Sequence, residues 1–108
     1  MKLNIKKQKI GSSVYNVEYV ADLQDKKGTD LAGRIWEIDK KIKICTDGTE
    51  QNQLQALLHE DLHGVCWEYG IKDIEDFITV FSNGIYALIV DNPKFIQKIL
   101  DYTKKIKK

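Results

Sequence analysis

The two histidines of the chain, His59 and His63, lie four positions apart in the segment HEDLH, with Glu60 directly after the first. On a helix, residues i and i+4 lie above one another, so both imidazoles can point at a single ion. This spacing is typical of H-E-x-x-H sites, in which the histidines bind Zn²⁺ and the glutamate accepts a proton from water. We therefore predict that His59 and His63 bind Zn²⁺ and that Glu60 is a general base and not a ligand.

The apolar residues around the motif predict which side of this helix faces the core. One continuous apolar stripe is formed by Leu54, Leu58, Leu62, Val65 and Tyr69. At about 100° per residue, both histidines lie roughly 100–140° from the centre of the stripe, and so border an opening beside the core. In the alternative interpretation, the histidines are surface residues that pair with nearby carboxylates. Trp67 projects to the same side as Glu60 and is either covered by another segment or lines a cleft.

A catalytic zinc usually has three protein ligands, and the third must come from elsewhere in the chain. The carboxylates that follow the motif helix are Asp73, Glu75 and Asp76. Asp73 and Asp76 suit a helix capping pair, which leaves Glu75 as the favoured ligand and Asp76 as the alternative. Cys66 is a further rival, but it lies about 10 Å along the helix axis from His59 at ~1.5 Å per residue. We expect Cys66 to be a buried thiol.

The elements that must position these residues differ between the two halves of the chain. The first half alternates apolar and polar residues, which predicts a hairpin from Leu3–Ile10 and Val14–Leu23, and then strand segments at Gly33–Asp39 and Lys41–Cys45. The second half predicts helices from Thr49 to Tyr69, from Lys72 to Val90, and from Pro93 onward. Asp47 is expected to cap the first helix, Asp73 the second, and Gly70 to end the first. The predicted fold is a single α+β domain over residues 1–108, with a small antiparallel sheet followed by three helices.

Composition restricts the classes of function. The chain has 108 residues, 43% hydrophobic and 31% charged, with a net charge of +1, so its overall charge does not favour nucleic acid or an anionic membrane as partner. No apolar run approaches the ~18 residues of a membrane-spanning helix, and the N-terminus lacks the apolar core of a signal peptide. We expect a cytoplasmic protein with Cys45 and Cys66 as reduced thiols.

The segment from Ile42 to Pro93 resembles small phage and prophage zinc metallopeptidase-like proteins, the minimal zincins. More distantly it is similar to the SprT-like and ImmA/IrrE-like peptidases. The resemblance rests on LLHEDLHGVCWEYG followed by IEDFITVFSNGIYALIVDNP, and it aligns Glu75 with the first glutamate of the family pattern. The sequence departs from the pattern at Asp76, often a glutamate, and at Asp61, often hydrophobic. The resemblance implies a zincin-like fold, peptidase activity, a zinc ion and a location in a bacterial host.

Three functional hypotheses follow. The leading one is zinc-dependent hydrolysis of peptide bonds in a protein or peptide substrate, with Glu60 as the base. The second is a zinc-stabilised, non-catalytic binding module that acts on a host or phage protein. The third is a metal-free domain with an accidental motif. For the leading hypothesis, Lys41–Cys45 is a candidate edge strand on which an extended peptide can pair, and Tyr86 is a candidate to polarise a substrate carbonyl.

Overall fold

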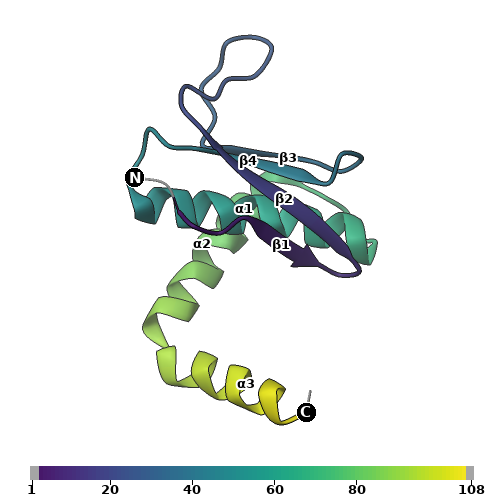
Figure 1. Ribbon diagram of the computed structural model, residues 1–108, viewed down its shortest axis with the longest axis vertical. Helices are drawn as coiled ribbons and strands as arrows, with labels where there is room; N and C mark the ends of the chain where they lie inside the picture. The colour runs from purple at the N-terminus through teal and green to yellow at the C-terminus, as the bar shows by residue number, and fades with distance from the viewer. Residues whose placement is uncertain (1–2, 107–108) are drawn as a thin grey trace.

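The computed structural model describes residues 3–106, which form a four-stranded sheet followed by three helices. The elements in chain order are β1 (Lys7–Ile10), β2 (Ser13–Val20), β3 (Gly33–Trp36), β4 (Lys41–Cys45), α1 (Glu50–Tyr69), α2 (Glu75–Asp91) and α3 (Pro93–Ile106). Helix α1 lies against one face of the sheet, and α2 and α3 lead away from this unit (Figure 1). The predicted α+β order of a small sheet and then three helices is confirmed.

The sheet is mixed and not wholly antiparallel. Its strand order is β1-β2-β4-β3, and the β1–β2 and β3–β4 pairs are antiparallel hairpins, whereas β2 and β4 are parallel. The reason lies in β4, whose Ile42 and Ile44 are fully buried. A strand whose inward-facing isoleucines are fully buried is best covered in the sheet centre, so the second hairpin docks on β2 through β4, and the connection over residues 21–32 sets the parallel direction.

The core forms where α1 meets the sheet. The buried apolar residues of this cluster are Ile10, Tyr15, Val17, Ile42, Ile44, Ala56 and Leu57. The predicted core stripe of α1 is wrong, because Leu54 and Tyr69 are exposed, whereas Gln53, Leu57 and Glu60 are buried. The small residues Ala56 and Gly64 of α1 face the sheet, so the helix and the sheet can approach each other closely. A Cβ on Gly64 would lie only 2.8 Å from Ile10 Cδ1.

The helix ends confirm some predicted caps and correct others. Thr49, and not Asp47, is the N-cap of α1, because its side chain accepts a hydrogen bond from the Asn52 backbone N–H. Gly70 ends α1 in the left-handed conformation at φ +68°, as predicted. Helix α2 begins at Glu75, and its N-cap residue Ile74 makes no capping side-chain bond. Asp73 is therefore not a cap, and its carboxylate is available for another contact.

Glu68 fastens the end of α1 to the sheet. Its carboxylate accepts hydrogen bonds from Ser13 Oγ at 2.8 Å and Tyr15 OH at 3.1 Å, and pairs with Lys40 Nζ at 2.8 Å. The hydrogen bond from Lys40 is the main reason that the pKa of Glu68 is lowered from its ordinary value. These contacts hold the helix that carries the histidines in a fixed orientation over β2. None of the helices within residues 3–106 is long and apolar enough to cross a membrane.

Candidate metal centre

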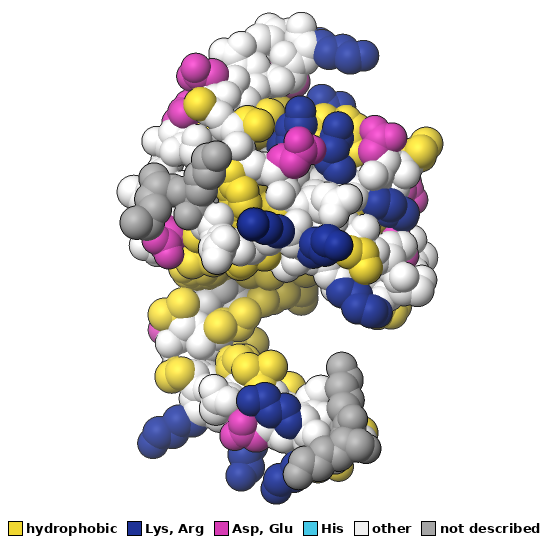
Figure 2. Space-filling model, in the orientation of Figure 1, with side chains coloured by type: hydrophobic (Ala, Val, Ile, Leu, Met, Phe, Trp, Pro, Cys, Tyr) yellow, Lys and Arg dark blue, Asp and Glu magenta, His cyan; other side chains and the backbone are white. Residues whose placement is uncertain are grey.

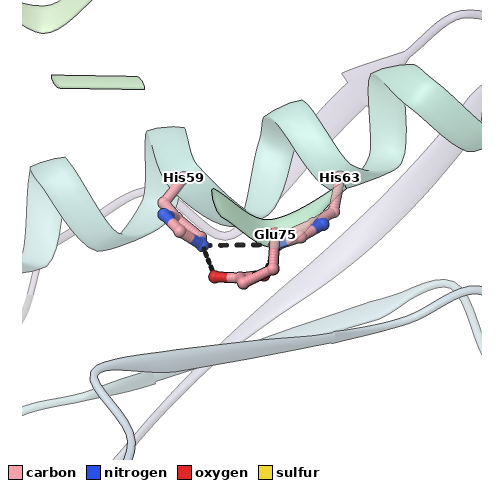
Figure 3. Close-up of side chains that lie close together, drawn as sticks. All are labelled: His59, His63 and Glu75. Atoms are coloured by element: carbon pink, nitrogen blue, oxygen red, sulfur yellow. Dashed lines mark hydrogen bonds and ion pairs between the residues drawn. The ribbon is translucent and has the colours of Figure 1, made fainter. Parts of the chain in front are cut away.

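The structure brings His59, His63 and Glu75 together at one point. Glu75 Oε1 lies 2.9 Å from His59 Nε2, and Glu75 Oε2 lies 2.7 Å from His63 Nε2. Figure 3 shows both imidazoles leaving adjacent turns of α1 and converging on the carboxylate. Glu75 reaches them because it is the first residue of α2, directly after the turn that follows Gly70. Each residue offers one ligand atom, and these atoms all lie within 4.8 Å of one another.

Asp73 orients His63 from the far side of its ring. Its Oδ1 lies 2.7 Å from His63 Nδ1, and its side chain is only 23% exposed. A proton on Nδ1 satisfies this contact and leaves a lone pair on Nε2, the atom that faces the cluster. Metal-binding histidines almost always have such a second partner. The short segment from Asp73 to Glu75 thus supplies both a carboxylate for the cluster and a carboxylate that orients one of its histidines.

The donor set fits a divalent cation. His63 lies between two carboxylates, but a neutral imidazole has only one N–H, so it can donate to Asp73 or to Glu75 and not to both. A second proton on the ring or a cation at the cluster satisfies both contacts, and with a cation the facing Nε2 lone pairs and the Glu75 oxygens act as ligands. The two Nε2 atoms are 3.3 Å apart, which is about the separation of two ligands held ~2.0–2.1 Å from a tetrahedral ion. Two imidazoles and a carboxylate are a common ligand set of catalytic Zn²⁺.

Glu60 lies beside the cluster and is not one of its three members. Its side chain is turned toward the sheet and only 8% of the residue is exposed. Burial is the main reason that the pKa of Glu60 is raised to about 7. The charge of His63 lowers this pKa, and the negative charges of nearby carboxylates raise it further. Gly33 of β3 makes room for it, because a Cβ there would lie 3.2 Å from Glu60 Cγ. The carboxyl group is thus held in a narrow space between α1 and β3.

A cleft of about 640 Å³ opens onto these residues from one side. Its walls include His59, Glu60, His63, Glu75 and Trp67, so the alternative in which Trp67 lines a cleft is the one that the structure supports. A second hollow reaches His59, Glu60 and Glu75 from the other side, past Asn52 and Ser82. The cluster therefore lies between two open spaces, and a long ligand can extend past it in both directions.

The other candidate residues lie away from the cluster. Cys66 is buried, and burial is the main reason that the pKa of its thiol is raised, which suits an inert cysteine. Asp76 is exposed, and Tyr86 is half-buried on α2 without lining the cleft. Asp61 accepts a hydrogen bond from Gln8 Nε2 at 2.5 Å, and burial raises its pKa to about 7. The hydrogen bond between Asp61 and Gln8 therefore links α1 to β1.

The edge strand beside the cluster is β3. The expectation that Lys41–Cys45 is an edge is wrong, because β4 lies between β2 and β3. Within residues 3–106, β3 pairs with β4 alone, and Gly33, Arg34 and Ile35 line the cleft together with His59 and His63. Sequence reasoning missed the roles of Gly33 and Asp73. A glycine in a strand is a signal of close backbone approach, whereas no signal in the sequence pairs Asp73 with His63.

Comparisons with known protein families, with curated proteins and with solved structures found no match.

Proposed function

We propose that this protein binds Zn²⁺ through His59, His63 and Glu75 and hydrolyses peptide bonds, with Glu60 as the general base. The observation that carries the proposal is the convergence of the three donor groups beside the buried Glu60 carboxyl in the wall of a cleft. The resemblance to the minimal zincins supports the same activity, since HEDLH is its specific part and the glutamate of the following helix agrees with the family pattern.

Each residue has a distinct role in this proposal. A zinc ion in the site would supply a Lewis acid that makes water more acidic and polarises a carbonyl group. Glu60 accepts the proton of the attacking water and later donates it to the leaving amine. Asp73 keeps the proton of His63 on Nδ1, so that Nε2 keeps its lone pair. The close contact with Gly33 and the surrounding core hold Glu60 in place and limit its access to bulk water.

The edge of β3 is suited to hold an extended peptide. Its outer backbone groups have no strand partner within the described residues, and three of its residues line the cleft beside the cluster. A peptide that pairs with this edge would lie across the cluster, with its ends in the two hollows on either side. Main-chain hydrogen bonds recognise a peptide in an extended conformation, so we propose that the substrate is an unstructured segment and not a folded domain.

The first test is the metal content of the purified protein. We expect close to one zinc per chain, and we expect His59→Ala and His63→Ala each to lose tight binding because each removes one of three ligands. Elemental analysis of protein dialysed against metal-free buffer measures this directly. A wild-type protein that holds no transition metal and takes up none when Zn²⁺ is added would support the alternative in which the histidines only pair with carboxylates.

Asp73→Ala should weaken zinc binding without abolishing it. The three ligands remain, but His63 loses the partner at 2.7 Å that fixes its ring and the position of its proton. Loss of such a partner typically costs about 10–100-fold in metal affinity. Competition with a chromophoric chelator measures the change. A zinc affinity equal to that of the wild type would show that the contact between Asp73 and His63 does not assist the metal.

A further inference from the structure

Most of α2 and all of α3 form an extension that we call the helical arm, residues 77–106. Its exposed large apolar side chains on α2 are Phe77, Val80, Phe81, Leu88, Ile89 and Val90. On α3 they are Phe95, Ile99, Leu100, Tyr102 and Ile106. Figure 2 shows apolar side chains along the stretch that leads from the sheet and α1 to α3. An apolar surface of this extent is typical of a protein–protein interface.

The arm cannot bury these residues against itself. Only Asn92 separates α2 from α3, and a single linking residue is too short to let α3 fold back along α2. Within the described residues, α3 packs mainly against the adjacent end of α2. Phe95, Ile99, Tyr102 and Ile106 follow helical spacing and leave one apolar stripe on α3 uncovered. A 14-residue helix is marginal in water without tertiary packing, so a partner that covers this stripe would stabilise α3.

Helix α2 carries an apolar groove along one face. The groove follows one face of α2 and is lined by Phe77, Val80, Phe81, Gly84, Ile85 and Leu88. Gly84 lies in the middle of it, and a Cβ built there would have no neighbour within 4 Å. Glycine inside a helix costs about 1 kcal/mol relative to alanine, and no contact of the described chain requires one here. A side chain from another helix that packs into this notch would account for it.

The charges of the two helices indicate which helix the groove accepts. Helix α2 has three acidic residues, Glu75, Asp76 and Asp91, and no basic one, whereas α3 has four lysines and a single aspartate. An acidic, apolar α2 is therefore complementary to a basic, apolar α3, which the same chain cannot bring to it. The exposed apolar side chains offer on the order of 1,000 Å² per chain. A standard interface buries about 800 Å² on each partner.

We propose that two copies of this chain form a dimer through their helical arms, with the apolar stripe of α3 from each copy in the α2 groove of the other. The same contact then occurs twice about a two-fold axis, as is usual for homodimers. Each α3 lysine face remains in water or approaches the acidic residues of the partner's α2. The proposal is independent of the zinc site, because the α3 stripe and the α2 groove contain no residue of the cluster and α2 remains acidic without Glu75.

Sedimentation equilibrium of the 108-residue chain tests the proposal. We expect the wild type to be a discrete dimer at micromolar concentration. Ile99→Glu on α3 places a charge in the apolar contact, and Gly84→Arg on α2 fills the notch with a long cationic side chain. Each should raise the dimer dissociation constant by about 100-fold or more. Ile38→Glu is the matched control, since Ile38 is 92% exposed and lies outside the arm, and it should leave the dimer intact.

Far-UV circular dichroism checks that the variants are folded. Gly84→Arg replaces a poor helix former with a good one, so it should not unfold α2. A wild type that is monomeric at 100 µM, or whose mass increases continuously with concentration, would overturn the proposal. A dimer that survives both arm variants would also overturn it. Co-sedimentation of a monomeric wild type with anionic phospholipid vesicles, lost in Ile99→Glu, would instead assign the arm to a membrane surface.

Discussion

Glu75→Ala should abolish tight zinc binding, whereas Asp76→Ala should leave it intact. Both oxygens of Glu75 contact the histidines, Oε1 at 2.9 Å and Oε2 at 2.7 Å. Removal of a third ligand leaves two imidazoles, and zinc affinity should fall by orders of magnitude. Asp76 is adjacent in sequence but exposed and outside the cluster. Its loss removes only a favourable charge near the N-terminus of α2, worth about 0.3–1 kcal/mol of stability.

The two variants form a matched pair because each removes one carboxylate from the first turn of the same helix. Zinc affinity is measured by chelator competition, and the melting temperature of each variant is measured without metal to separate binding from folding. Glu75→Gln is a useful third variant, since it keeps the size of the side chain and removes its charge. Metal retained by Glu75→Ala and lost by Asp76→Ala would move the third ligand to Asp76 and contradict the geometry of the cluster.

The parts of the fold that sequence could predict are those set by local spacing. The order of sheet and helices follows from alternation in the first half and from helix signals such as Gly70 and Pro93 in the second. The motif is equally local, because four residues on a helix place His59 and His63 on one face wherever the helix lies. These predictions needed no knowledge of which elements pack together.

Apart from the helix caps, the predictions that were wrong depended on packing between distant segments. The predicted core face of α1 includes Leu54 and Tyr69, but the helix buries Ala56 and Gly64, because the close approach to the sheet favours small side chains at these positions. The strand Lys41–Cys45 was expected at an edge, but its isoleucines are buried and it takes the centre. Apolar content alone does not specify which neighbour covers a residue.

In the candidate site, too, local spacing could be predicted and packing between segments could not. Sequence reasoning favoured Glu75 over Asp76 because Asp73 and Asp76 suited a capping pair. The structure brings Glu75 to the histidines, but the predicted capping pair is wrong, since α2 has no side-chain cap and Asp73 contacts His63 instead. The distance between Glu75 and the histidines depends on the left-handed conformation of Gly70 and on the four residues that follow it. That geometry is a property of the folded turn and cannot be calculated from residue spacing.

Glu60→Gln should keep the zinc and lose the hydrolytic activity, and this separates an enzyme from a binding module. The amide has the size of the carboxyl group, so it fits the space beside Gly33 without a clash, but it cannot accept a proton from water. Loss of a general base typically lowers the rate about 10²–10⁴-fold. Cleavage of an unstructured protein such as casein, followed with zinc content on the same samples, measures both properties.

The matched control is Asp61→Asn, which makes the same carboxyl-to-amide change one residue further along α1. Asp61 bonds Gln8 and does not belong to the cluster, so this variant should retain activity. If wild type and Glu60→Gln each bind one zinc and neither cleaves protein, the protein is a zinc-stabilised binding module and Glu60 has no catalytic role. If Glu60→Gln loses its zinc as completely as His59→Ala, then Glu60 is a ligand and the roles must be reassigned. Only metal retention combined with loss of cleavage supports Glu60 as the residue that moves the proton.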